Sequence, residues 1–426
     1  MPHPLFWSDD VNTITWIQHA IGQGGFHSGQ LINKDGIRFN WIFDCGAKNS
    51  KQFENYLLDW TRRLNEPVDW LFISHFDFDH VSGLNTLMSR CVIQDVMIPY
   101  VNDEELAYVL LSEIARGNLD RTLVELIADP ASFFLSRGAN RIIFLNGGRP
   151  MEPGGREDRE PPEPPDESTA GEDGRGWTIR ISKPVAALTT PAWAHSASGP
   201  SRVGIVNGGT CAVTIVRGSI GLRLMPYRAP ITQTAHSQLL VDVQNLVKHA
   251  LSSWPGRPGL RGLAYAIAQH ARTPNGRAEL RTLHKNHAGS SNRASLSLLS
   301  EPFNFDPLRA YCNVNYPFDH FSTAPNGVWI NTGDAELLAP TDLNDWQKCY
   351  STSLADVRVL ALPHHGSDKN SDGNLQVLCP KALFTAHVKS TSKKHPGANV
   401  SLTAGKRLAC VSEKKSTEVL MKFYSH

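Results

Sequence analysis

Four side chains that can bind metal ions lie within six positions of one another, at the end of an apolar run. These side chains are His75, Asp77, Asp79 and His80, and they lie within the run 71–84. Imidazole and carboxylate are the usual protein ligands of a hydrolytic zinc, manganese or iron ion. If a strand continued through the motif, His75, Asp77 and Asp79 would face the same side. The alternative is a solvated strand end where His and Asp residues meet by chance.

Three further polar clusters follow apolar stretches that have the composition of strands. Asp334 comes after 328–332, the pair His364-His365 comes after 357–362, and His387 ends the stretch 382–387. Because each cluster follows a strand, the strands would position these side chains as they position His75. A carboxylate such as that of Asp334 can offer one oxygen to each of two ions.

The first motif resembles the metallo-β-lactamase superfamily signature H-x-H-x-D-H, with Asp77 where the second histidine usually stands. This exchange and the Val-Ser-Gly-Leu that follows resemble one subgroup, the hydrolase domain of the DNA-uptake (competence) proteins. Three later strings also resemble that subgroup: Thr332-Gly-Asp-Ala-Glu336, His364-His-Gly-Ser367 and His395-Pro396. The resemblance covers most of 13–146 and 290–400. It implies an α/β fold, the four-layer αββα sandwich, and two divalent ions, zinc or manganese.

The resemblance also implies roles for particular residues. Asp334 would bridge two ions, and Asp79 would orient a hydroxide as well as bind metal. His395 would donate a proton or contact a phosphate. Adjacent histidines on an extended backbone face opposite ways, so only one of His364 and His365 would contact a given ion. We assign the metal ligands to His75, Asp77, Asp79, His80, Asp334, His365 and His387, and the catalytic roles to Asp79, His364 and His395.

Two positions stay open. No histidine stands clearly in the superfamily's middle metal motif, for which His195 and His236 are candidates by position only. Asp44 ends the predicted strand 37–43, where it either supports the metal site or serves as a turn residue.

Strands and helices alternate along the chain, which predicts a layered α/β domain. We expect 1–146 and 291–426 to form the two halves of a metallo-hydrolase core. Between them, 147–177 is dense in Pro, Glu and Gly and cannot bury enough apolar surface to order itself, so we predict a disordered loop. The stretch 178–290 reads as an insertion, partly helical and locally basic. Its basic residues form either a solvated face or a clamp for a phosphate backbone.

Composition limits the class of protein. The chain has 426 residues, enough for one large or two ordinary domains, and its net charge of +1 gives no general attraction to nucleic acid. Its seven cysteines are scattered without a C-x-x-C pair, which argues against a disulfide framework. We find no signal peptide and no membrane span, so we expect a cytoplasmic protein.

These observations predict a metal-dependent hydrolase. Two divalent ions would lower the pKa of a bridging water and supply hydroxide near neutral pH. The subgroup resemblance implies a phosphodiesterase or nuclease, with nucleic acid or another phosphodiester as substrate. One alternative is an ester, lactone or thioester hydrolase on the same fold. Another is a non-catalytic protein that binds a protein partner through 147–290.

Overall fold

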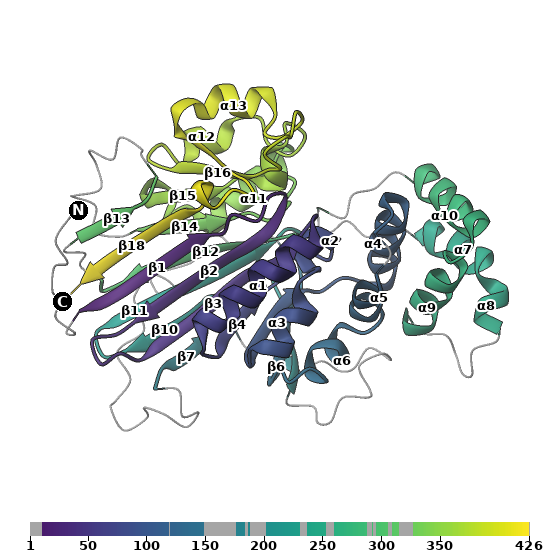
Figure 1. Cartoon of the computed structure of the whole chain (residues 1–426), viewed down its shortest axis with the longest axis horizontal. Helices are drawn as coiled ribbons and strands as arrows, with labels where there is room; N and C mark the ends of the chain where they lie inside the picture. Colours follow the sequence, from purple (N-terminus) through teal and green to yellow (C-terminus); the bar gives the residue numbers. More distant parts are fainter. Residues whose placement is uncertain are drawn as a thin grey trace.

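The computed structural model describes residues 11–118, 120–148, 176–183, 186–187, 202–230, 237–252, 260–287, 292, 295–305, 309–314 and 327–425. Within these ranges two large sheets lie face to face, and helices cover their outer sides (Figure 1). The predicted four-layer α/β sandwich is therefore confirmed.

The first sheet is antiparallel at one end and parallel through its middle. In the described residues its strand order is β13 (Arg309–Cys312), β18 (Val419–Ser425), β1 (Asn12–Gln18), β2 (Gly24–Ile32), β3 (Arg38–Ala47), β4 (Val68–Phe72), β5 (Ile93–Pro99), β6 (Arg141–Leu145), β9 (Val203–Val206) and β8 (Ala186–Ala187). The strand predicted over 37–43 lies within β3, and β1 and β2 pair as an antiparallel hairpin before it.

The second sheet has the same mixed character. Over the described ranges its order is β17 (Leu408–Val411), β16 (Leu383–His387), β15 (Val357–Ala361), β14 (Val328–Asn331), β12 (Leu296–Phe303), β11 (Ile220–Arg228), β10 (Val213–Arg217) and β7 (Thr178–Ile181). Strands from the stretch 178–230 thus belong to the sandwich itself. The boundaries of the predicted insertion stay a prediction.

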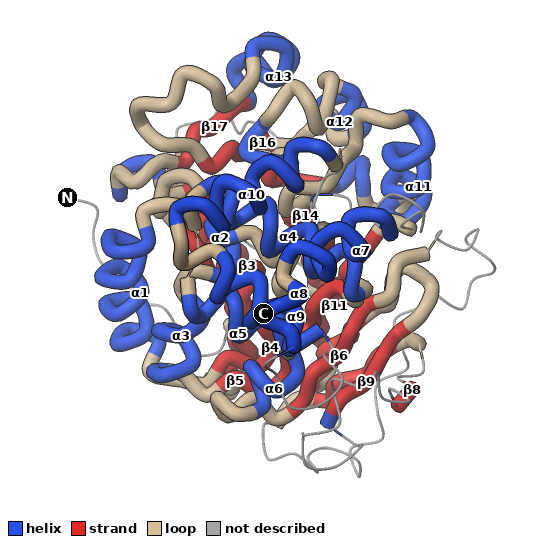
Figure 2. The backbone as a smooth tube through the Cα atoms, turned by 90° about the vertical axis from the view of Figure 1, so that its right-hand side faces the viewer, coloured by secondary structure: helices blue, strands red, loops and turns tan. Residues whose placement is uncertain are grey.

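The helices fall into three groups. Those on the first sheet are α1 (Ser50–Leu64), α2 (Phe78–Val81), α3 (Leu84–Arg90), α4 (Asp103–Arg116), α5 (Arg121–Ala128) and α6 (Pro130–Leu135). Those on the second sheet are α11 (Pro340–Tyr350), α12 (Asn374–Leu378) and α13 (Ala398–Ala404). A third group, α7 (Ser237–Leu246), α8 (Lys248–Ser252), α9 (Leu260–His270) and α10 (Pro274–Asn286), packs on α4 and α5. Figures 1 and 2 both show this third group together at one end of the sandwich.

The core follows from the alternation of side chains along the strands. In β3, Phe39, Trp41 and Phe43 pack between the two sheets, whereas Ile42 packs under the helices of the first sheet. A third apolar cluster, which includes Trp346 of α11, lies between the second sheet and its helices. Three apolar layers therefore hold four layers of structure together.

Some sequence-based expectations need correction or lie outside the described residues. In the stretch 178–290, which was expected to be partly helical, α7 and α8 are separated at Val247. The segment 149–175, which makes up most of the predicted disordered loop, lies outside the described residues. None of the described helices has both the length and the apolar character to cross a bilayer. All seven cysteines are unpaired, as expected.

Candidate metal centre

The candidate site lies where parallel strands of both sheets end. β3 runs parallel to β4, and β14 runs parallel to β15 and β15 to β16. Loops that follow parallel strands meet at one edge of a sheet, the usual place for a binding site in α/β proteins. Asp44 lies near the end of β3, and His75, Asp334 and His365 follow β4, β14 and β15.

The first motif is a loop and a short helix, and not a continued strand. β4 ends at Phe72 and α2 begins at Phe78, so the predicted alternation of ligands along a strand is wrong. The turn of α2 instead brings the ring of His80 back to that of His75, with ring centroids 4.1 Å apart. Both rings are buried.

Asp334 faces three histidines that come from two loops. Its Oδ1 lies 3.3 Å from Nε2 of His80, and its Oδ2 lies 3.7 Å from Nε2 of His75. Oδ2 also lies 3.5 Å from Nδ1 of His364. The backbone N–H of Asp334 donates to Oγ of Ser295 at 3.0 Å. This bond holds the loop that follows β14 in place. The sequence motif that follows β14 therefore meets the motif that follows β4.

Two groups of potential ligands share His80. One is His75, His80 and Asp334, and the other is Asp79, His80 and His365, each with its ligand atoms within 4.8 Å of one another. In the second group Nε2 of His365 lies 3.4 Å from Oδ2 of Asp79. Such a pair of adjacent groups can hold one or two cations. Four predicted residues, Asp77, His364, His387 and His395, belong to neither group in the described part of the chain.

Asp44 contacts both Ser74 and the ring of His80, and so supports the metal centre. It lies in the left-handed region at φ 60°, and its carboxylate accepts from the backbone N–H of Ser74 at 2.6 Å and from the Ser74 hydroxyl at 2.7 Å. It also pairs with Nδ1 of His80 at 2.7 Å. A carboxylate there holds the proton on Nδ1 and leaves Nε2 of His80 free to bind a metal. Of the two readings of Asp44, this geometry favours support of the site.

The His-His-Gly-Ser string forms a turn, and not an extended segment as predicted. His364 and His365 both have left-handed backbone angles, with φ of 46° and 58°. Two consecutive residues of this kind are uncommon outside glycine and often mark functional sites. The turn directs His364 to Asp334 and His365 to Asp79. The ring of His395 lies 5.9 Å from that of His364, centroid to centroid.

An arginine that the sequence interpretation missed holds Asp77. Nη1 of Arg116, in the last turn of α4, lies 2.6 Å from Oδ2 of Asp77. Asn102 and Glu105 form a capping box at the start of α4, which fixes the helix that carries this arginine. No local pattern near the metal motif indicates Arg116, because the two residues are 39 positions apart.

A small cavity lies under the centre and contains two further histidines. His27 of β2 and His387 of β16 line it together with His80 and His365. Both ring nitrogens of His27 and Nε2 of His387 are buried without a hydrogen-bond partner. Burial, with the nearby His365 and His80, lowers the pKa of His387 to about 3, so the ring is neutral. His27 was not predicted, because it lies within a strand that shows no polar cluster.

Neighbouring charged groups in the metal centre shift the pKa values of His80 and Asp79. Burial opposes the charged form of His80, but the carboxylates of Asp44 and Asp334 outweigh it and raise the pKa of the ring. Burial likewise opposes ionisation of Asp79, yet its bond to His365 and the charge of His80 lower its pKa. The pKa values of Asp79 and Asp334 are both lowered, so these two carboxylates are ionised and can attract a cation.

The residues present fit divalent metal ions. Nε2 of His75, Nε2 of His80 and Oδ1 of Asp334 are all buried without a hydrogen-bond partner. The two atoms of His80 and Asp334 approach to 3.3 Å without the alignment of a hydrogen bond. Buried polar atoms of this kind are rare unless an ion or a water satisfies them. Two imidazole nitrogens and a carboxylate oxygen are a donor set for zinc or manganese.

Comparisons with known proteins give one family match and several similar solved structures. Residues 34–183 match the family model described as the metallo-beta-lactamase superfamily. One similar solved structure is the metallo-β-lactamase MIM-1 from Novosphingobium pentaromativorans, at 12% identity and a TM-score of 0.27, covering 91% of this chain and 87% of that chain. Another is a long-form RNase Z from yeast, at 10% identity and a TM-score of 0.27, covering 96% of this chain and 38% of that chain. No curated protein matches the chain.

The two-sheet sandwich is consistent with the metallo-β-lactamase fold, and the family match covers 34–183 of the 426 residues. The matched residues contain the first motif, but Asp334, His365 and His387 lie beyond them. Proteins of the metallo-beta-lactamase superfamily are generally metal-dependent hydrolases.

Proposed function

We propose that the protein is a metal-dependent phosphodiesterase whose substrate is nucleic acid or another phosphodiester. The observation that carries the proposal is the pair of ligand groups that share His80, one with Asp334 and one with Asp79. Paired divalent ions at such a site supply Lewis acidity and an acidified water, the usual means of phosphodiester hydrolysis. The resemblance of the motifs to the competence-protein subgroup supports this class of substrate.

The residues of the chain have distinct proposed roles. His75, His80 and Asp334 bind one ion, and Asp79, His80 and His365 surround a second position. Asp77 lies 3.9 Å from His75, and His387 lines a cavity with His80 and His365, so we keep both as proposed ligands.

His364 and His395 lie on the open side of the centre, where both rings are partly exposed. We assign them to the phosphate and the leaving group. Burial, with His365 and His364 beside it, lowers the pKa of His395 to about 4, so this ring is neutral until an anion binds. A phosphate oxygen next to it would raise that pKa and favour a proton on the ring.

The helical group α7–α10 offers a second contact for a long substrate. α10 packs on α4, the helix that carries Arg116 to the metal motif. Lys285 lies in the last turn of α10, and the ring of His284 lies 5.2 Å from that of Tyr108 of α4, centroid to centroid. We propose this face as a clamp for a phosphate backbone. The alternatives are a solvated face and a contact for a protein partner.

The test is hydrolysis of single- and double-stranded DNA and RNA, and of bis(4-nitrophenyl) phosphate, with added manganese, magnesium or zinc. The variant Asp79→Ala plus His80→Ala should abolish the metal-dependent activity, because it removes members of both ligand groups. Asp59→Ala, on the exposed side of α1, is the matched control and should behave as the wild type.

Other outcomes would select the alternatives. Metal binding with cleavage only of carboxylic esters or lactones would favour the ester hydrolase. Absence of both metal binding and cleavage would favour a partner-binding protein. A cytoplasmic location stays an expectation, to be tested by fractionation.

A further inference from the structure

A cavity that contains a serine lies between α1 and the outer side of the first sheet. Its volume is about 110 Å³, and β1, β2, β3 and α1 all contribute to its wall. Ser28 of β2 lines it, whereas the neighbouring His27 lines the small cavity under the metal centre. Adjacent residues of a strand face opposite sides of a sheet, so the two cavities lie on opposite sides of β2.

Ser28 belongs to a chain of hydrogen bonds that passes through a histidine. Its hydroxyl lies 2.7 Å from Nε2 of His19. Nδ1 of the same ring lies 2.7 Å from the hydroxyl of Tyr56, which donates to Oε2 of Glu418 at 3.0 Å. Oε2 of Glu418 also lies 3.6 Å from Nδ1. The four side chains therefore connect a carboxylate, through an imidazole, to a hydroxyl in the wall of a cavity.

These partners determine which nitrogen of His19 carries the proton. Tyr56 has one hydroxyl proton and donates it to Glu418, so its oxygen accepts from Nδ1–H of His19. Nε2 then carries no proton and accepts from the hydroxyl of Ser28. Burial lowers the pKa of His19 from its usual 6.5, so the ring is neutral at neutral pH. A hydroxyl beside an unprotonated imidazole nitrogen, with a third group that orients the ring, is the arrangement of an activated nucleophile.

Glu418 supplies the negative charge of the chain. Burial opposes its ionisation, but hydrogen bonds to His19 and Lys415 outweigh burial and lower the pKa of Glu418 to about 2. When His19 takes up a proton, the nearby carboxylate stabilises the imidazolium.

The remaining lining suits a small acyl group. Apolar side chains form part of the wall: Ile17, Ile42, Trp60 and Leu64. Gln30 lies two residues from Ser28 on the same face of β2, and one of its two amide N–H groups donates to Oδ1 of Asn40. The second amide N–H and the hydroxyl of Thr15, which lies opposite Gln30, are donors for an oxyanion. Because pockets for whole drug-sized ligands are larger, this cavity suits one short group.

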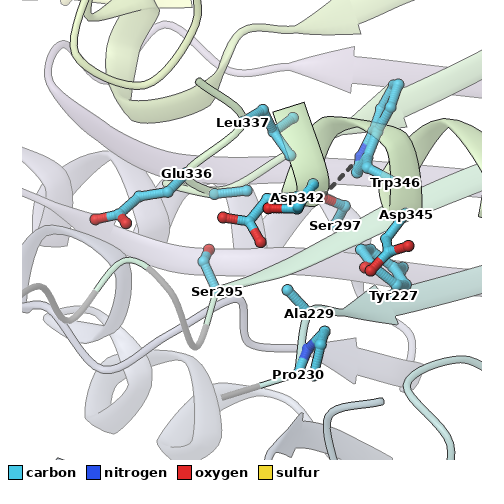
Figure 3. A pocket seen from close by; sticks show the side chains of 12 residues that line it. Tyr227, Ala229, Pro230, Ser295, Ser297, Glu336, Leu337, Asp342, Asp345 and Trp346 are labelled. Carbon is cyan, nitrogen blue, oxygen red and sulfur yellow. Dashed lines mark hydrogen bonds between the residues drawn. The ribbon is translucent and has the colours of Figure 1, made fainter. Parts of the chain in front are cut away.

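A larger cavity, of about 210 Å³, lies beside α11 and differs in its chemistry (Figure 3). Its three carboxylates, Glu336, Asp342 and Asp345, already have partners. The hydroxyl of Ser297 in its wall accepts from Nε1 of Trp346 at 3.2 Å. The cavity of Ser28, in contrast, has a nucleophile beside a base.

We propose that Ser28 is the nucleophile and His19 the general base of a second hydrolytic site, which cleaves esters of small apolar acids. Oγ of Ser28 attacks the carbonyl carbon of the ester, and its proton passes to Nε2 of His19. The alcohol leaves with that proton, and the acyl group stays on Oγ. Water then attacks the acyl carbon and gives a proton to Nε2; the carboxylic acid is released, and the proton returns to Oγ. Tyr56 and Glu418 are positioning residues that hold the ring.

The first experiment measures acylation by 4-nitrophenyl butyrate, with an acid quench followed by intact-mass measurement and peptide mapping. We expect a butyryl group on Ser28, attached about 100-fold faster than on the exposed Ser351, the factor typical of a positioned general base. His19→Gln should remove this advantage. Ser353→Ala is the matched control, because Ser353 is also buried and its hydroxyl donates to Glu301 at 3.0 Å away from the cavity. This variant should keep the wild-type rate.

The second experiment tests the positioning role of Glu418 through the pH dependence of acylation. Glu418→Gln removes the charge that raises the pKa of His19, so the midpoint of the acylation rate should move to lower pH. Lys415 and Arg63, the other charged groups near the ring, act in the opposite direction and are unchanged in this variant. A purely structural role of Glu418 would leave the midpoint where it is in the wild type.

The outcomes are distinct from those of the metal centre. Ester cleavage that Asp79→Ala plus His80→Ala abolishes belongs to the metal centre, whereas cleavage that Ser28→Ala abolishes belongs to the serine. Ser28→Cys keeps a nucleophile beside Nε2 of His19 and should be butyrylated at the same position. Absence of a butyryl group at position 28 in both the wild type and Ser28→Cys would overturn the proposal. Equal acylation of Ser28 in the wild type and in His19→Gln would overturn it as well.

Discussion

Asp44→Asn should weaken metal binding while the sandwich stays folded. Asparagine tolerates the left-handed backbone of position 44, so the change alters the side chain without adding backbone strain. One oxygen can still accept from the backbone N–H of Ser74. The new amide nitrogen, however, faces Nδ1 of His80 and donates to it. Nδ1 then becomes an acceptor, and the proton moves to Nε2, the atom that must bind the metal.

The expected loss of metal affinity follows from this change of tautomer. Loss of the group that orients a ligating histidine typically lowers metal affinity about 10–100-fold, which corresponds to about 1.4–2.7 kcal/mol. The metal-free protein should also lose about 1–3 kcal/mol of unfolding free energy, because a buried bond between charged groups is removed. Since Asp44 is 1% exposed, solvent does not screen the effect.

The assay is competition for zinc against a chromogenic chelator, with thermal unfolding measured with and without metal. Asp95→Asn is the matched control, since Asp95 is also buried in the first sheet and pairs with Arg141 at 2.8 Å away from the site. That variant should lose stability and keep its zinc affinity. The reasoning is refuted if Asp44→Asn binds zinc as tightly as the wild type, or if Asp95→Asn weakens zinc equally.

Three further changes test other parts of the structure. In Gly25→Ala the new Cβ would lie 2.6 Å from Nδ1 of His80, so the variant should lose about 1–3 kcal/mol of stability, and zinc should raise its melting temperature less than it raises that of the wild type. In Arg116→Gln, Asp77 loses its ion pair with Arg116, so kcat/KM should fall about tenfold. Stability should change by less than about 1 kcal/mol, because Arg116 is 46% exposed; unchanged kinetics would contradict a positioning role. Burial lowers the pKa of His19 below its usual 6.5, so its contribution to stability is present above pH 6.5 and is lost as pH falls below it. His19→Gln should therefore flatten the pH dependence of the urea midpoint between about pH 7 and 5.

The order of strands and metal motifs could be predicted because each signal is local. An apolar run followed by a polar cluster marks a strand that ends at a site, and β4, β14, β15 and β16 all follow this rule. α11 was missed although its signal was present. Pro340 at the start and Leu343, Trp346 and Tyr350 at helical spacing indicate a helix.

The geometry of the centre could not be predicted, because it depends on contacts between distant segments. The bend after Phe72 and the left-handed angles of His364 and His365 replace the strand alternation that the sequence indicated. His27 and Arg116 reach the site only through the packing of β2 and α4. The candidates His195 and His236 lie outside the described residues, so the middle motif stays a prediction.

The most direct test of the metal centre is the number of ions bound per chain, measured by mass spectrometry of the purified protein after loading with zinc or manganese and removal of free metal. We expect two ions in the wild type and at most one in Asp334→Ala, because Asp334 faces His75, His80 and His364 together. A wild type that retains no ion, or an Asp334→Ala variant that retains both, would contradict the account.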